Sequence, residues 1–194
     1  MIFRETALRG ACAIELEPHT DDRGQFVRTW CREEFASHGI DVEFAQSSVS
    51  INPEQGTLRG LHWQATPHAE AKLVRCVRGA IYDVIVDIER GSPTFGKWIG
   101  LTLTPQSQLM LYVPRGFAHG FQTLVDDTEV NYLLSCAYVA AAGRGLRYDD
   151  PALAISWPLP VSRMSDRDRS WPLLDKKDAH KTPAGATSAS ATSA

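Results

Sequence analysis

The sequence predicts an all-β protein, a sandwich or a barrel, with little helix. The run AIYDVIVDIE at 80–89 alternates apolar and acidic side chains with the period of two that is typical of a half-buried strand. Further β-rich runs follow at fairly regular spacing, separated by glycine and proline turn signals. Only one stretch, CREEFASHG at 31–39, has a convincing helical pattern. Many short strands with one helix indicate two packed sheets or a closed barrel.

Each element can be placed along the chain. The helix at 31–39 ends in Gly39, a residue suited to a helix C-terminus. Gly79 and the segments RGSPTFG and PRGFAHG are read as turns between strands. No internal repeat is present. The strands are expected, in chain order, over 57–64, 72–79, 80–89, 97–103, 109–114 and 130–138.

The chain is expected to form one domain over residues 1–175. A chain of 194 residues is long enough to bury a substantial core. From 176 to 194 the sequence becomes rich in Ala, Ser and Thr and holds almost nothing apolar that could offset the entropy of ordering. We therefore expect a disordered tail without function there.

Composition excludes several function classes. The chain is 43% hydrophobic and 22% charged, with a formal net charge of −3, which argues against a nucleic-acid surface but leaves a local phosphate pocket open. No apolar run approaches the roughly 20 residues of a membrane span, and the N-terminus carries charges where a signal peptide would be apolar. The four cysteines are widely spaced, without a CxxC pair, so reduced thiols in a cytoplasmic protein are expected.

His62 in TLRGLHWQ is the first candidate for chemistry. Strand alternation would place His62 on the same face as Gly60, which leaves room for a ligand, and Arg59 on the opposite face. Taken alone, a histidine in a strand is more often a packed or surface residue than a base.

Lys72 opens the run KLVRCVRG on the side of its apolar residues. A buried ammonium is costly, so this lysine would have to be paired or functional. The alternative is a strand-end lysine whose amine extends to water.

Tyrosine and histidine supply further candidates. Tyr132 and Tyr138 would lie on one side of the strand at 130–138, where a tyrosine is most often a packing residue. His119 lies between two glycines in GFAHGF, read as an aromatic loop, and is a ligand, a phosphate donor or a turn residue.

A metal or a nucleotide cofactor is not expected. His62 has no second histidine two residues away, and His62 with His119 does not complete a coordination sphere. Neither a P-loop nor a GxGxxG motif is present.

Several segments, in order, resemble the dTDP-4-dehydrorhamnose 3,5-epimerase family over roughly residues 1–175. The resemblance implies a cupin jelly-roll β-barrel or sandwich with a few short helices, a homodimer, a nucleotide-sugar substrate, and neither a metal nor a cofactor. The matching segments are DDRGQF, GTLRGLHWQ, KLVRCVRGAIYDVIVDIERGSPTFGKW, YVPRGFAHGF, RGLRYDDPALAISWP and SDRD with WPLL.

The resemblance also implies roles for individual residues. His62 matches a general base, Asp168 the carboxylate that orients it, Lys72 a cation beside the substrate's keto oxygen, and Tyr132 a general acid. The positions that match contacts to the sugar, diphosphate or nucleotide are Arg59, His119, Arg23, Gln46, Arg167 and Tyr138.

Three positions depart from the family pattern. Arg28 stands where many members have a glutamate, Ser48 where asparagine is common, and Gly143 where a ligand-contacting glutamate is often found. Arg28 and Ser48 are kept as substrate-binding candidates. The expected reaction is inversion of C3 and C5 of dTDP-4-dehydro-6-deoxy-D-glucose. Inversion of only one of these carbons, a GDP- or CDP-linked sugar, a non-catalytic sugar-nucleotide-binding protein and a metal-dependent cupin enzyme remain alternatives.

Overall fold

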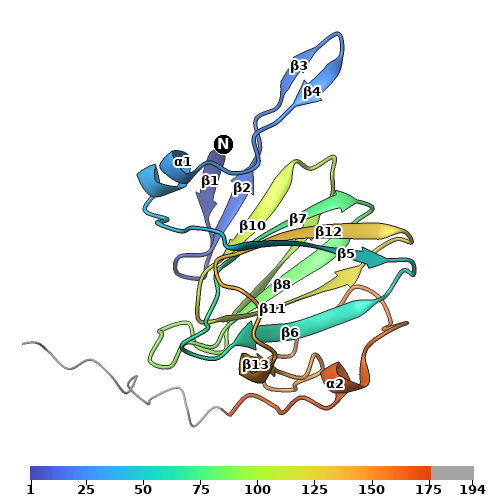
Figure 1. Cartoon of the computed structure of the whole chain (residues 1–194). Coiled ribbons are helices and arrows are strands. Elements are labelled where there is room, and N and C mark those ends of the chain that lie inside the picture. The colour runs from blue at the N-terminus through green and yellow to red at the C-terminus, as the bar shows by residue number, and fades with distance from the viewer. Residues whose placement is uncertain (176–194) are drawn as a thin grey trace, which may run out of the picture.

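The computed structural model describes residues 1–175, in which two antiparallel β-sheets pack face to face (Figure 1). This confirms the predicted all-β sandwich with few short helices. The expected tail at 176–194 lies outside the described residues.

The larger sheet has six strands and the smaller has five. In spatial order the larger sheet contains β1 (Ile2–Glu5), β2 (Cys12–Glu15), β10 (Leu109–Val113), β7 (Lys72–Arg78), β12 (Thr128–Leu134) and β5 (Gln46–Asn52). The smaller sheet contains β13 (Gly143–Gly145), β6 (Leu58–Gln64), β11 (Phe117–Thr123), β8 (Ile81–Asp87) and β9 (Trp98–Leu103).

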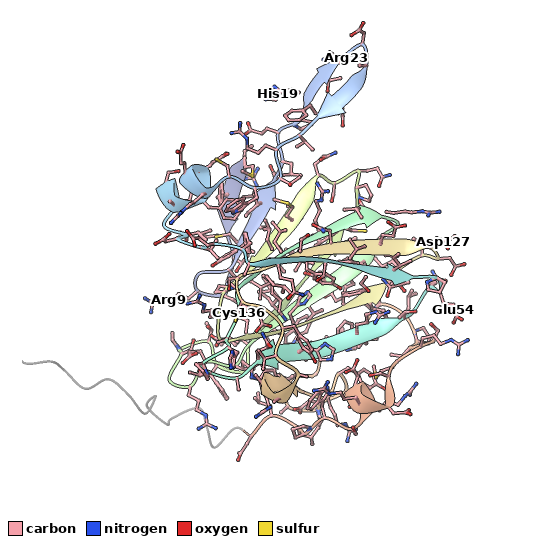
Figure 2. All side chains as sticks on the ribbon, in the orientation of Figure 1. Arg9, His19, Arg23, Glu54, Asp127 and Cys136 are labelled. Atoms are coloured by element: carbon pink, nitrogen blue, oxygen red, sulfur yellow. The ribbon has the colours of Figure 1, made fainter. Side chains whose placement is uncertain are left out.

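A two-stranded hairpin stands apart from both sheets. It is formed by β3 (His19–Asp21) and β4 (Gly24–Phe26) and projects from the body at the end remote from α2 and β13 (Figure 1). Figure 2 shows Arg23 at the end of this hairpin.

The apolar residues form three layers. The central layer, between the sheets, takes Val74 from β7 and Ile85 from β8. A second layer lies where α1 (Arg32–Ser37) covers the outer face of the larger sheet with Phe35. A third lies where the C-terminal segment covers the outer face of the smaller sheet.

Helices are short, as predicted. The helix expected at 31–39 is α1, which is followed by Gly39 in the left-handed region at φ 77°. A 3-10 turn, η1 (Ala140–Ala142), and α2 (Asp166–Arg169) were not located from the sequence, because three or four residues are too few to show a helical period.

Two predicted element boundaries are wrong. His119 lies within β11 and not in a loop, because Gly120 is a strand residue. A Cβ on Gly120 would come within 2.9 Å of the Gly60 Cα atom, so this glycine allows β6 and β11 to approach closely. The strand predicted at 130–138 is β12 and ends at Leu134, so Tyr138 lies beyond it.

The predicted separation of Arg59 from His62 is also wrong. In the pairing of β6 with β11, Phe121 faces Arg59 and His119 faces His62, so β6 has one more residue than its partner over this interval. A bulge of this kind shifts the alternation by one residue. Arg59 and His62 therefore both line the same pocket.

The four cysteines are free thiols, as predicted. Within residues 1–175, no helix combines the length and the apolar character that a membrane span requires.

Candidate active site

A pocket of about 690 Å³ opens between the two sheets. Strands β5, β7 and β12 of the larger sheet line one side, and β6, β11 and β13 of the smaller sheet line the other. The segment at 163–171, which contains α2, closes part of the rim beside β6 (Figure 1). Groups at the two sides of this pocket are therefore held by different sheets.

His62 and Asp168 form a hydrogen-bonded pair in the pocket wall. The distance from His62 Nε2 to Asp168 Oδ1 is 2.6 Å, and the Asp168 side chain is 6% exposed while that of His62 is 43% exposed. An ionised carboxylate can only accept hydrogen bonds, so Nε2 must carry the proton. His62 Nδ1 is then left with a lone pair that can accept a proton.

Asp168 is surrounded by donors. Besides His62, the Trp171 Nε1–H group donates to Oδ1 at 3.2 Å, and the Gly60 backbone N–H donates to the carboxylate. Burial alone would raise the pKa of Asp168, but the hydrogen bonds and the charge of His62 outweigh it and hold the pKa below its ordinary value. The carboxylate therefore stays ionised.

Local structure fixes the position of Asp168. Ser165 caps α2 by accepting a hydrogen bond from the Asp168 backbone N–H at 3.1 Å. The Trp171 ring occupies the space that a Cβ at Gly145 would take, and the Arg167 guanidinium lies 4.8 Å from the ring centroid. One indole ring therefore contacts both the histidine–aspartate pair and a cation at the rim.

Lys72 reaches across the sandwich. Its Nζ atom donates to the His62 carbonyl oxygen at 3.0 Å, which ties β7 of one sheet to β6 of the other. Burial lowers the pKa of Lys72, while the negative charges of Glu70 and Asp83 raise it. The lysine is thus buried and paired, and its amine does not extend to water as the alternative for a strand-end lysine required.

Tyr132 lines the pocket from β12, in the sheet opposite to His62. Burial and the charge of Asp83 raise its pKa, against smaller opposing effects of a hydrogen bond with Ser50 and of the charge of Arg59. The phenol therefore remains protonated across the neutral range.

Further polar contacts hold the floor of the pocket. His119 Nε2 lies 2.8 Å from Asp83 Oδ1, and both side chains are buried. Arg59 Nε donates to Asn52 Oδ1 at 2.7 Å, and this acceptor carries no charge. His119 and Arg59 are thereby held against the pocket.

Most of the residues predicted for substrate binding line this pocket. Gln46, Ser48, Tyr138 and Arg167 do so together with Arg59 and His119. Gln46 joins two of them, because its amide donates to Ser48 Oγ at 3.1 Å and its carbonyl accepts from the Tyr138 backbone N–H at 3.1 Å.

Arg23 and Arg28 do not line the pocket of their own chain. The Arg23 side chain is 85% exposed at the end of the hairpin, where it pairs with Asp21 (Figure 2). Arg28, which follows the hairpin, is exposed.

Several residues at the site were not singled out from the sequence, and three of them contact the proposed catalytic or binding residues directly. Asp83 is an inward-facing acid in the alternating run 80–89 and contacts His119. Glu70 precedes Lys72 by two residues, and this spacing places two side chains on the same face of an extended chain. Trp171 follows Asp168 by three residues. Alternation could have indicated the first two, but the contact of Trp171 depends on how the segment after α2 folds.

The pocket is predominantly basic. Its acidic lining residues are Glu70 and Asp168, whereas its cationic lining residues are Arg59, Lys72, Arg144, Arg163 and Arg167. Such a pocket favours an anionic ligand. Within residues 1–175, no group of three or more His, Cys, Asp or Glu side chains is arranged to hold a metal ion.

The sequence is similar to proteins of one known family. Residues 5–176 match the family model described as dTDP-4-dehydrorhamnose 3,5-epimerase. The protein of that name from Sinorhizobium fredii is 41% identical over 175 residues, which cover 90% of this chain and 90% of the relative.

Two solved structures are also similar. The crystal structure of dTDP-4-dehydrorhamnose 3,5-epimerase from Bacillus anthracis, with TDP and PPi bound, has a TM-score of 0.86 and 42% identity, and covers 89% of this chain and 99% of that one. The structure of dTDP-6-deoxy-D-glucose-3,5-epimerase from Legionella pneumophila in complex with dTDP-4-keto-L-rhamnose has a TM-score of 0.85 and 33% identity, and covers 94% and 99% of the two chains.

Proposed function

The chain belongs to the dTDP-4-dehydrorhamnose 3,5-epimerase family and is a sugar-nucleotide 3,5-epimerase with a cupin fold, and we propose that its proton transfers are carried out by His62, Asp168, Lys72 and Tyr132. The observation that carries this proposal is the placement of the His62–Asp168 pair on one sheet and its adjoining segment, with Lys72 and Tyr132 on the other sheet, around one basic pocket.

His62 acts as the base. In a 4-keto sugar, the C–H bonds at C3 and C5 are both adjacent to the carbonyl and are acidic for that reason. His62 Nδ1 takes the proton, and the electron pair of the C–H bond moves into the ring to give an enolate with its charge on the C4 oxygen. Asp168 holds the imidazole in the tautomer that leaves Nδ1 free and stabilises the imidazolium that forms.

Lys72 stabilises the enolate. A fixed ammonium aimed at the C4 oxygen gains interaction energy as the charge develops, and the low dielectric of a buried site strengthens that gain. The Nζ atom is anchored on the His62 carbonyl oxygen, so the cation is held close to the base that creates the charge.

Tyr132 acts as the acid. Inversion requires a proton on the face of the carbon opposite to the one that lost it. Tyr132 belongs to the sheet opposite to His62, and its raised pKa keeps the phenol protonated until the enolate accepts the proton. The imidazolium then releases its proton and the phenolate regains one, so the reaction is balanced with no change of oxidation state.

The basic pocket binds the nucleotide part of the substrate. We assign Arg59, His119 and Arg167 to the diphosphate or sugar, and place the nucleoside against Gln46, Ser48 and Tyr138. The relatives crystallised with TDP or with dTDP-4-keto-L-rhamnose make a dTDP-linked substrate the first choice.

A homodimer completes the site in this proposal. The hairpin carries Arg23 and the 74%-exposed Phe26 away from the body, and β5 exposes Val49 at 55% and Ile51 at 67% along the edge of the larger sheet. An exposed apolar sheet edge needs a cover. A second copy that packs against β5 would bury it, and its hairpin would bring Arg23 and Arg28 to this chain's pocket.

The experiment that tests the function is an NMR assay with dTDP-4-keto-6-deoxyglucose in deuterium oxide. We expect deuterium to enter at C3 and C5, with the rhamno configuration appearing, and His62→Ala to abolish both exchanges. Tight binding of the substrate without any exchange would instead identify a non-catalytic binding protein. Exchange retained in His62→Ala would mean that another residue is the base.

A further inference from the structure

Glu70 forms a buried ion pair with Lys72 that the mechanism above does not use. The Glu70 Oε1 atom lies 3.2 Å from Lys72 Nζ, and the two side chains are 6% and 9% exposed. The other carboxylate oxygen, Oε2, accepts a hydrogen bond from the Gln64 backbone N–H at 3.1 Å. Glu70 is therefore fixed at both oxygens, one on β6 and one on the lysine.

The contacts of the ammonium determine where it can point. A lysine ammonium has three N–H donors. The His62 carbonyl oxygen takes one at 3.0 Å, and Glu70 takes a second. Lys72 itself lines the pocket, so the third N–H is available to a group inside it.

The surroundings of Lys72 also determine its charge. An ammonium this deeply buried loses most of its hydration, which favours the neutral amine unless a carboxylate compensates. Of the acids nearby, Asp83 is bonded to His119 and Asp168 to His62, whereas Glu70 contacts the ammonium itself. Arg59 and Tyr132 also line this pocket, and neither can supply negative charge while Tyr132 is protonated.

We propose that Glu70 is a positioning residue that keeps Lys72 in its ammonium form and directs the remaining N–H to the keto oxygen of the substrate. The proposal rests on the enolate-stabilising function of Lys72 proposed above.

The test is the pH dependence of kcat for wild type and Glu70→Gln. The amide has nearly the shape of the carboxylate but no charge, so the pKa of Lys72 should fall further and the ammonium should be lost at lower pH. We expect the basic limb of the profile to move down by about 1–3 pH units, the range that an adjacent opposite charge produces. KM should change little, and the acidic limb, which depends on His62 and Asp168, should stay in place.

The matched control is Glu15→Gln, which also converts an ion-paired glutamate to its amide. Glu15 pairs with Arg4 at 2.7 Å outside the pocket, so this variant should keep the wild-type profile. A purely structural function of Glu70 would lower the melting temperature without moving the basic limb, and that outcome would overturn the proposal.

Two further measurements separate the possible failures. If Glu70→Gln does not fold, Glu70→Asp is the variant to test, because it retains the charge on a shorter side chain. We expect a reduced kcat and a smaller downward shift of the basic limb of the pH profile. An unchanged kcat with an unchanged basic limb would refute the proposal. An NMR titration of the Lys72 Nζ signal, assigned with Lys72→Met, should show a lower pKa in the Glu70 variant even without substrate. A wild-type protein without deuterium exchange would refute the proposed function, whereas an active wild type with an unmoved basic limb in Glu70→Gln would refute only the inference about Glu70.

Discussion

Asp168→Asn should reduce both catalysis and stability, because the Asp168 carboxylate accepts from three donors. These are His62 Nε2–H at 2.6 Å, Trp171 Nε1–H at 3.2 Å and the Gly60 backbone N–H. The His62 and Trp171 donors both reach Oδ1, so an asparagine whose NH₂ group takes the Oδ1 position turns it towards both of them. If that group faces His62, the imidazole moves its proton to Nδ1 and is no longer a base.

The expected loss of rate follows from the charge that is removed. A hydrogen bond to a charged group contributes about 1.5–3 kcal/mol, which corresponds to a rate loss of about 10- to 150-fold when each 1.4 kcal/mol is tenfold. The wrong tautomer would increase this loss. Because a single base serves both carbons, deuterium wash-in at C3 and at C5 should fall by the same factor.

The contribution of Asp168 to the stability of the folded protein should depend on pH. A buried donor without a partner costs about 1–3 kcal/mol, and the melting temperature should fall by about 2–12 °C. The pKa of Asp168 is lowered in the folded protein, so its contribution is complete above the unfolded value of about 3.9 and is lost as the pH falls through the folded value. The difference in melting temperature between wild type and variant should therefore be full at pH 7 and shrink below about pH 4.

Solvent-exchange NMR and differential scanning calorimetry on the same samples provide the assay. A variant that keeps exchange at both carbons within about threefold of wild type, well under the tenfold that 1.4 kcal/mol represents, would refute the assigned function of the His62–Asp168 pair. A difference in melting temperature that does not change with pH would show that the carboxylate charge is not the stabilising element.

Three other variants test separate parts of the site. Tyr132→Phe keeps the ring but loses the proton donor. The rate of inversion should therefore fall by about 10²–10⁴-fold, while the rate of deuterium wash-in at the original face falls less. Equal losses in the two rates would contradict the acid function. Gly145→Ala would place a methyl group against the Trp171 ring. We therefore expect a destabilisation of about 1–3 kcal/mol, seen as a lower melting temperature, and a reduced rate of deuterium exchange. Unchanged values of both would show that the position of the ring is unimportant. A mixture of the Arg23→Ala and His62→Ala variants should regain activity that neither variant has alone, because each mixed dimer has one intact site. With random pairing in a two-fold dimer, the activity should reach at most about a quarter of wild type. Mixing without any gain, with dimers confirmed by sedimentation, would place Arg23 in its own chain's site or outside both.

The sequence predicted those features that depend on residues close together in the chain. The alternation in AIYDVIVDIE predicted the strand β8, but the expected half-buried character is wrong. Asp83 and Asp87 are as buried as Val84 and Val86, because apolar layers cover both faces of the smaller sheet. Gly39 ends α1 as predicted, because its left-handed conformation is available to glycine at little cost. These properties depend on neighbours in the chain and are readable in one sequence.

The remaining features depend on pairings between distant segments. Gly120 resembles a turn residue until its approach to Gly60 is known, and the bulge that brings Arg59 to the side of His62 exists only in the register of β6 with β11. The family resemblance identified His62 and Asp168, which are 106 residues apart, but periodicity gives no indication that they meet. Glu70 was overlooked because its importance comes from the burial of the lysine that it contacts.

The division of the proposed reacting groups between two sheets makes the apolar core a determinant of substrate size. Val74 and Ile85 lie between the sheets and help to set the distance between His62 and Tyr132, the proposed base and acid. Close-packed cores yield little to compression, so this spacing is a fixed dimension of the molecule. An engineer who wishes to admit a bulkier pyranose would therefore begin with the aliphatic residues behind the pocket and leave every polar residue in its wall untouched.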